Sequence, residues 1–244
     1  MREEDSLPVL LLLTCCVDPK GMAYTVINDR NTRIKQYYEA FDFYLENTSY
    51  KILIVENTLF DIDEKYLNND RVEYLTFNGN DFDKTLGKGF GEALILEHAI
   101  KNSVLIKENP NVKIAKITGR LKILNLKILL QQVLHTKKDE TVYADTNWKL
   151  TFVYSYFFVA NVNFLSNFFL SNKIEINDTK GVYFEHVLQN AIKKYKKKGF
   201  NFKCFKKTIL IDGVSASTGT TFIKKSNLGA DIKQFLKFLI NNLF

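Results

Sequence analysis

The sequence predicts an α/β fold with a mainly parallel, or mixed, central sheet flanked by helices. Short and nearly continuous apolar runs at residues 9–16, 51–55, 72–77 and 112–117 are typical of buried strands. Segments with apolar residues three and four positions apart, typical of helices, separate these runs. Because strands and helices alternate, we expect parallel pairing within one domain that comprises residues 1–244.

The composition narrows the class of protein. Hydrophobic residues make up 46% of the chain, which excludes disorder, and no apolar run approaches the roughly 20 residues of a membrane-spanning helix. Acidic residues precede the first apolar run, which argues against a signal peptide, and the three cysteines have no zinc-site or disulfide spacing. We therefore expect a cytoplasmic protein, with the inner face of the cell membrane as an alternative site of action.

The chain is basic, with 34 Lys and Arg against 27 Asp and Glu and a net charge of +7. This charge favours anionic partners. The densest basic cluster, residues 193–198, ends a predicted helix, where lysines complement the helix dipole. No nucleic-acid-binding motif accompanies it, so we expect no nucleic-acid partner. A nucleotide ligand and an anionic membrane surface remain open.

The first half of the chain alternates strands and helices. The first strand, residues 9–16, leads into a loop at Asp18-Pro19-Lys20-Gly21, and residues 31–45 form a predicted helix with one buried face. The second strand ends at Glu56 and Asn57, and the third ends in a polar loop at residues 78–83. A helix should follow the glycine-rich loop Gly87-Lys-Gly-Phe-Gly-Glu92, since Ala93, Leu96, Ile100 and Val104 keep helical spacing.

The fourth strand breaks abruptly at Thr118-Gly119-Arg120, and helical spacing resumes immediately afterwards with Ile123, Leu126, Leu130 and Val133. In open α/β sheets the ligand crevice lies at the carboxyl ends of the strands. An arginine that follows a glycine there can contact a phosphate or carboxylate in forked geometry. Arg120 is therefore a candidate ligand-binding residue.

The second half differs in character. Residues 151–160 predict a mixed or antiparallel strand, and Asp178 with Thr179 should cap the next helix, whose first turn contains Glu185. A last strand at residues 208–211 leads into a small polar loop. Residues 230–244 form an amphipathic helix with the apolar stripe Ile232, Phe235, Leu236, Leu239 and Leu243, flanked by Lys233 and Lys237. That stripe either packs on its own domain or docks on anionic lipid.

Five motifs resemble those of bacterial GT-A-like glycosyltransferases of capsule and lipopolysaccharide clusters: Glu56-Asn57-Thr58, Gly87-Lys-Gly-Phe-Gly-Glu92, Lys116-Ile-Thr-Gly-Arg120, Gly181-Val-Tyr-Phe-Glu-His186 and Gly213-Val-Ser-Ala-Ser-Thr-Gly219. The resemblance implies a GT-A-like fold. Residues 1–135 would bind a nucleotide-sugar and residues 136–229 an acceptor, which would be a glycan or a lipid-linked glycan. Candidate donor-binding residues at strand ends and in these motifs are Thr14, Glu56, Asn57, Lys88, Gly89, Glu92, Thr118, Gly119 and Arg120.

The sequence departs from that resemblance at the metal site. Such enzymes usually carry an Asp-x-Asp after the fourth strand to hold Mg²⁺ or Mn²⁺ on the diphosphate, and this chain has Thr118-Gly119-Arg120 there. Asp61 with Asp63, and Asp81 with Asp83, have the right spacing in other loops. We interpret both pairs mainly as turn carboxylates and keep Asp81 and Asp83 as weak metal-ligand candidates.

Sugar transfer also requires the diphosphate to be stabilised and the acceptor hydroxyl to be deprotonated. Arg120 and Lys88 are candidates for the first task, the latter because helix starts attract phosphate. Glu185 resembles the acidic residue that inverting enzymes place at a helix start beside the acceptor. A glutamate there also simply favours the helix dipole. Asp145 is the second candidate for the base.

We therefore expect an inverting hexosyltransferase that builds a cell-surface glycan. Two alternatives remain open. A metal-dependent nucleotidyltransferase would also use strand-end loops, but it would need metal-binding carboxylates and a nucleoside triphosphate. A non-catalytic membrane-associated or scaffold protein with a degenerate site would tolerate substitution of Arg120 and Glu185.

Overall fold

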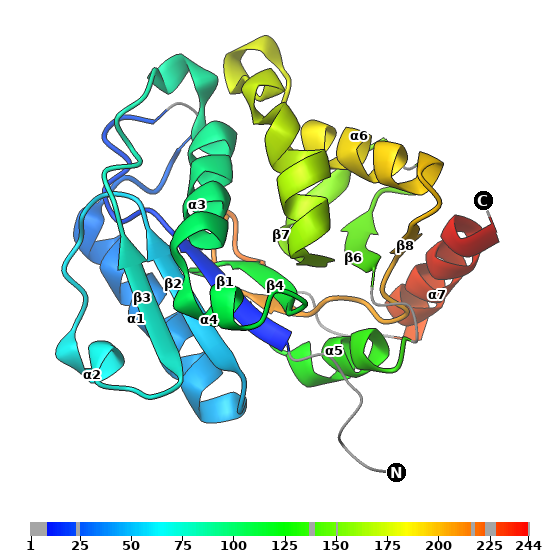
Figure 1. Ribbon diagram of the computed structural model, residues 1–244, viewed down its shortest axis with the longest axis horizontal. Helices are drawn as coiled ribbons and strands as arrows, with labels where there is room; N and C mark the ends of the chain where they lie inside the picture. Colours follow the sequence, from blue (N-terminus) through cyan, green and yellow to red (C-terminus); the bar gives the residue numbers. More distant parts are fainter. Residues whose placement is uncertain are drawn as a thin grey trace.

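A computed structural model describes residues 9–22, 25–136, 140–149, 151–215, 218–222 and 228–243. Across these residues a seven-stranded sheet has the strand order β3-β2-β1-β4-β7-β6-β8, and a small second sheet pairs β5 with β9 (Figure 1). The strands are β1 Val9–Cys15, β2 Lys51–Glu56, β3 Val72–Thr76, β4 Lys113–Thr118, β5 Lys122–Ile123, β6 Thr141–Thr146, β7 Val153–Asn161, β8 Asn201–Lys203 and β9 Ile211–Asp212.

The first four strands of the large sheet are parallel, and the rest of it is mixed. β1 pairs in parallel with β2 and β4, and β2 pairs in parallel with β3. β7 runs antiparallel to both β4 and β6, and β8 is parallel to β6. The predicted α/β class with a mainly parallel, mixed sheet is confirmed.

Helices cover both faces of the large sheet (Figure 1). The helices are α1 Arg30–Asn47, α2 Glu64–Leu67, α3 Lys88–Asn102, α4 Val104–Glu108, α5 Leu126–Leu134, α6 Phe184–Lys197 and α7 Leu228–Leu243, with short helical turns η2 Lys84–Leu86, η3 Phe164–Phe169, η4 Leu170–Glu175 and η5 Asp178–Lys180. Every residue of β1 is buried. Its alternate side chains supply two separate cores, one shared with α3 and α6 and the other with α1 and α5.

The chain after β4 differs from the sequence prediction. Helical structure does not resume directly after Arg120, because Lys122 and Ile123 form β5 and pair antiparallel with β9. Ile123 is buried as predicted, but as a strand residue whose backbone N–H donates to the Tyr44 hydroxyl at 2.9 Å. Helix α5 begins only at Leu126. β9 is itself shorter than the predicted strand at residues 208–211 and is shifted toward Asp212.

Two predicted helix starts are also wrong. Lys88 is the first residue of α3 and not part of a preceding loop, so Gly89 and Gly91 are helical. Asp178 does not cap α6 but belongs to the turn η5. Helix α6 begins later, at Phe184, where the Tyr183 backbone N–H donates to Nδ1 of His186 at 3.1 Å. Glu185 does occupy the first turn of α6, as predicted.

The remaining differences concern helix ends and a missed strand. Helix α3 ends at Asn102, and Ser103 caps the separate helix α4, so Val104 is exposed and does not continue the buried face of α3. Asp145 lies in strand β6, a segment without a strand prediction. Across the described ranges, no helix combines the length and the apolar character that a membrane crossing requires.

Candidate functional site

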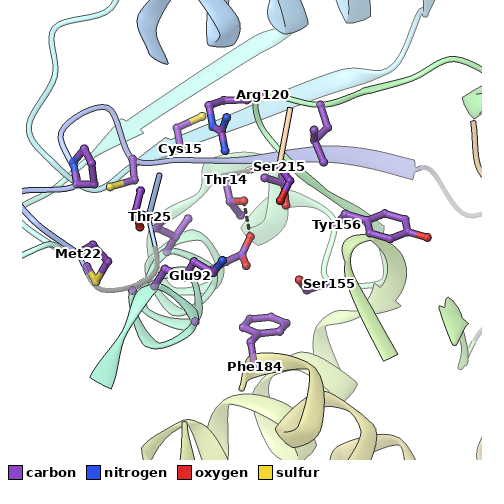
Figure 2. Close-up of a pocket in the computed structure, with 18 of the residues that line it drawn as sticks. Thr14, Cys15, Met22, Thr25, Glu92, Arg120, Ser155, Tyr156, Phe184 and Ser215 are labelled. Carbon is purple, nitrogen blue, oxygen red and sulfur yellow. Dashed lines mark hydrogen bonds between the residues drawn. The ribbon is translucent and has the colours of Figure 1, made fainter. Parts of the chain in front are cut away.

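A cavity of about 700 Å³ opens where the carboxyl ends of β1, β2 and β4 meet the first turns of α3 and α6 (Figure 2). Its volume falls within the range of small-molecule sites. The amino end of antiparallel β7 adds Ser155 and Tyr156 to the same edge, because β7 pairs with β4. Arg120 lies on the β1 side of the cavity, across from Ser155 and Phe184 (Figure 2).

The cavity brings together most, but not all, of the residues that the sequence predicts for the site. Those that line it are Thr14, Asn57, Lys88, Gly89, Glu92, Thr118, Arg120 and Glu185. Those outside its lining are Glu56, Gly119, Asp145, Asp81 and Asp83. The predicted polar loop contributes Ser215 and Thr218, and its residues 216 and 217 lie outside the described residues.

Glu56 lies behind the cavity wall and orders the loops that form it. Its buried carboxylate accepts hydrogen bonds from the backbone N–H groups of Val17 at 3.0 Å, Thr58 at 2.7 Å and Phe60 at 3.1 Å. The Thr76 hydroxyl donates to the same carboxylate at 3.1 Å. One side chain therefore joins the loops after β1 and β2 to the end of β3.

Gly119 permits a close approach between β4 and β1. Its N–H donates to the Thr14 carbonyl at 3.0 Å. A Cβ atom at this position would lie 2.7 Å from Sγ of Cys15 and 2.8 Å from the Thr14 carbonyl oxygen. Only glycine fits there without displacing β1, and the turn places Arg120 at the cavity.

Arg120 and Asn57 each leave a polar atom without a partner among the described residues. Arg120 is 4% exposed, and its Nη1 donates to Oε1 of Gln36 at 2.8 Å, while its Nε has no acceptor. Burial lowers the pKa of Arg120, but an arginine stays protonated. Asn57 is 2% exposed, and its Oδ1 has no donor. Unsatisfied buried polar atoms are costly, so their occurrence in two residues of one cavity wall marks this edge of the sheet as unusual.

A second arginine strengthens the positive potential at the end of β1. Arg33 donates from Nε to the Cys16 carbonyl at 2.7 Å and from Nη2 to the Tyr37 hydroxyl at 3.3 Å. The Tyr37 hydroxyl in turn accepts the Cys16 N–H at 2.8 Å. Burial nevertheless raises the pKa of Cys16 to about 11, so its thiol is neutral at pH 7.

An ion pair supports the cavity wall, where Glu92 lines the cavity and its partner Lys116 lies behind it. Lys116 on β4 is fully buried, and its Nζ lies 2.5 Å from Oε1 of Glu92 on α3. The Thr14 hydroxyl donates to the same carboxylate oxygen at 2.9 Å (Figure 2). Lys116 also donates to the Ser155 carbonyl at 2.6 Å. The pair therefore joins β1, β4, β7 and α3. Lys116 interrupts an otherwise apolar strand, and this is the feature of the sequence from which a buried ion pair could have been predicted.

The first turn of α3 faces a carboxylate of the same chain. The Gly89 N–H donates to Oδ2 of Asp178 at 3.4 Å. Gly87 has φ +84°, and a Cβ atom there would lie 2.3 Å from Cβ of Asp178. Burial raises the pKa of Asp178, although the Gly89 hydrogen bond opposes this shift. Asp178 lines the cavity, and sequence reasoning missed it as a site residue because it predicted a helix cap instead.

Glu185 presents its carboxylate to the cavity from the second residue of α6. The Ser155 hydroxyl donates to Oε1 of Glu185 at 2.6 Å. Lys116 holds the Ser155 carbonyl, so the backbone that carries this hydroxyl is anchored by the Lys116–Glu92 pair. Glu185 is partly exposed and therefore accessible to a ligand.

Asp145 has a different environment. It is buried in β6, and its Oδ2 accepts the Tyr156 hydroxyl at 3.0 Å. Its Oδ1 forms an ion pair with Lys237 of α7 and accepts Nε2 of Gln234 at 3.4 Å. Of the two carboxylates predicted for catalysis, the structure places Glu185 at the cavity and uses Asp145 to hold α7.

The aspartate pairs that the sequence offered as metal-ligand candidates are helix caps or exposed side chains. Asp83 caps η2 by accepting the Thr85 N–H at 2.9 Å, and this hydrogen bond lowers the pKa of Asp83. Asp63 caps α2 in the same way through the Lys65 N–H, while Asp81 and Asp61 are exposed. In the part of the chain that the structure describes, no three His, Cys, Asp or Glu side chains gather as a metal-ligand group.

No family model and no curated protein matches this chain. Among solved structures, the chain is similar to the apo structure of WbbM, described as a bifunctional glycosyltransferase, with 11% sequence identity and a TM-score of 0.46. The similarity covers 99% of this chain and 45% of that chain, so the chain spans less than half of WbbM. A likeness this distant assigns no function.

Proposed function

We propose that the protein is a glycosyltransferase that moves a sugar from a nucleotide-sugar donor to a glycan or lipid-linked glycan. One observation carries the proposal. A single cavity contains a buried arginine with an unpartnered N–H on one side and a serine-held glutamate on the other. A cation for a leaving diphosphate and a base for an attacking hydroxyl are the two groups that metal-independent sugar transfer requires.

The donor would bind at the strand ends. Arg120 would contact the diphosphate, because its guanidinium group lines the cavity and is oriented by Gln36, and a guanidinium suits a charge-assisted contact with a phosphate oxygen. Asn57 would supply an acceptor for an N–H group of the nucleotide through its unpartnered Oδ1. Lys88, at the first position of α3, lines the same cavity and would add positive charge.

The reaction would then proceed by direct displacement with inversion at the anomeric carbon. The acceptor oxygen forms the new bond to that carbon as the bond to the diphosphate breaks, and the hydroxyl proton passes to Glu185. The hydrogen bond from Ser155 holds the Glu185 carboxylate in the cavity during this step. The negative charge of the leaving diphosphate is stabilised by Arg120 and Lys88, without a step through a metal.

The structural observations favour this proposal over the two alternatives. A nucleotidyltransferase would need metal-binding carboxylates, and Asp81 and Asp83, a pair with the expected spacing, lie outside the cavity lining. A degenerate scaffold site would not require a buried arginine on one side of the cavity and an accessible, serine-held glutamate on the other. The sequence resemblance supports a capsule or lipopolysaccharide precursor as the acceptor.

Ligand-dependent thermal stability tests the proposal directly. A ligand that binds only the native state stabilises it by mass action, so one nucleoside diphosphate and its sugar derivatives should raise the melting temperature selectively. The stabilising nucleotide-sugar should then release nucleoside diphosphate in the presence of an acceptor. Release of pyrophosphate from a nucleoside triphosphate would indicate a nucleotidyltransferase. Stabilisation by none of the uridine, guanosine, cytidine or thymidine diphosphates would contradict the proposal.

A further inference from the structure

Helix α7 packs on the domain through its polar face. Gln234, Lys237 and Asn241 are buried. Opposite them, five large apolar side chains are exposed, from 40% for Leu239 to 52% for Ile232; the five are Ile232, Phe235, Leu236, Leu239 and Ile240. Of the two alternatives for this apolar stripe, packing on its own domain therefore does not hold for the described members of the stripe.

Specific polar contacts fix this rotation of the helix. Lys237 forms an ion pair with Asp145 and donates to the Thr146 carbonyl at 2.7 Å. Gln234 donates to the Phe205 carbonyl at 2.8 Å. Turning α7 to bury its apolar face would leave the Asp145 carboxylate buried without its counter-charge, which is strongly unfavourable. The exposed position of the apolar face is thus a consequence of how α7 is attached.

The exposed side chains form a continuous surface. Ile232, Leu236 and Ile240 follow one another at intervals of four residues, and Phe235 and Leu239 form the neighbouring row. The two rows contain no charged residue, since the charged residues of α7 are Asp231, Lys233 and Lys237. An apolar face of this kind on a helix marks a docking surface.

Exposed lysines lie near this apolar surface. Lys233 is exposed on α7, and Lys206 is exposed with its Nζ 5.2 Å from the centre of the Phe238 ring. Asp231 is the single acidic residue of α7, and its carboxylate lies 3.2 Å from Nζ of Lys207. Helix α6 ends in several lysines, and its carboxyl end lies on the same side of the molecule as α7 (Figure 1). Apolar rows with cations nearby complement an interface rich in anionic headgroups.

We propose that α7 docks the protein on a bilayer surface that contains anionic lipids. The two apolar rows enter the interfacial region, and the nearby lysines contact headgroup phosphates. A second copy of the chain fits this surface less well, because face-to-face packing of two α7 helices would bring their lysines together. The inference does not rest on the proposed sugar transfer, since it depends only on the attachment of α7.

Vesicle flotation of the full chain, without nucleotide or acceptor, tests the inference. We expect binding to vesicles of phosphatidylcholine and phosphatidylglycerol and much weaker binding to phosphatidylcholine alone. Leu236→Glu removes one apolar side chain from the interface and should lower the partition coefficient about tenfold or more. Leu239→Glu should have the same effect. Ile174→Glu is the matched control, because Ile174 is 75% exposed in η4, outside α7, and its replacement should leave binding unchanged.

Further outcomes decide between lipid and other occupants. Lys206→Glu combined with Lys233→Glu should weaken binding to the anionic vesicles, and added salt should do the same. Absence of binding by the parental chain, or equal binding by Leu236→Glu at an unchanged melting temperature, would overturn the inference. A parental dimer that Leu236→Glu converts to a monomer, without vesicle binding, would assign the surface to self-association instead. None of these measurements depends on transfer activity, so the two proposals fail separately.

Discussion

The ammonium group of Lys116 lies 2.5 Å from the carboxylate of Glu92, which lines the candidate site. Lys116 is fully buried and Glu92 is only partly so. The pair connects the central strand β4 to α3, and Thr14 and Ser155 complete its hydrogen bonds. A buried lysine is tolerated in this position because the Glu92 carboxylate neutralises its charge.

We expect Glu92→Gln to lower the free energy of unfolding by about 3 kcal/mol or more, since it leaves the Lys116 ammonium buried without a counter-charge. Adding Lys116→Met should recover much of the loss. Urea denaturation measures both effects. Glu97→Gln is the control: Glu97 also lies on α3, but its partners Lys101 and Lys173 are both solvent-accessible, so each lost pair should cost less than about 1 kcal/mol. Equal losses for Glu92→Gln and Glu97→Gln would contradict a role for the buried pair.

The sequence predicts well those features of the fold that depend on residues close together in the chain. Every residue of β1 is apolar or small and is buried, so its position in a two-sided sheet follows from the run itself. The carboxyl ends of parallel strands share one edge of the sheet. For that reason the placement of Thr14, Asn57 and Arg120 around one cavity could be predicted without a structure.

The part that sequence reasoning missed depends on partners far apart in the chain. Asp178 accepts a hydrogen bond from the Gly89 N–H in the first turn of α3, 89 residues away. The sequence around Asp178 does not indicate this contact. Asp145 and Lys237 are 92 residues apart, and their pairing decides which face of α7 is buried. Helical periodicity identifies the two faces of α7 but does not say which one meets the domain.

Arg120→Ala should weaken binding of a nucleoside diphosphate far more than binding of the nucleoside. A charge-assisted contact in a buried site is worth about 1.5–3 kcal/mol, or roughly 10- to 150-fold in affinity. Arg120→Lys keeps the charge but loses the forked geometry and should give an intermediate loss. Titration calorimetry separates the three cases. Equal losses for the nucleoside and the diphosphate would point to a disturbed fold and contradict a phosphate contact.

Chelation should cost little activity. Arg120 and Lys88 line the cavity where a metal would neutralise a diphosphate, and the described carboxylates do not form a metal-ligand group. Sugar transfer measured with excess EDTA should therefore stay near the rate without EDTA. Complete loss that Mn²⁺ reverses would contradict this expectation and return Asp81 and Asp83 to consideration.

Cys16 provides a reporter for the occupied site. It lines the cavity, and burial raises its pKa to about 11. Only the thiolate reacts, so alkylation by iodoacetamide should be slow at pH 7 and accelerate about tenfold per pH unit below pH 11. A bound nucleoside diphosphate should slow the reaction further. Mass spectrometry of the parental chain and of Cys16→Ser assigns the label. A rate that does not respond to pH would show that Cys16 is not held in this environment.

Glu185→Gln separates an enzyme from a binding protein. The substitution preserves the shape of the side chain and removes the proton acceptor, so transfer should fall roughly 10²- to 10⁴-fold. Donor affinity, measured by titration calorimetry, should survive. Asp145→Asn provides the contrast. It weakens the attachment of α7 through Lys237, and it should lower the melting temperature while leaving the transfer rate of the folded protein nearly unchanged. Transfer by Glu185→Gln at the parental rate would reduce Glu185 to a residue that favours the start of α6, and Asp178 would become the next carboxylate of the cavity to test.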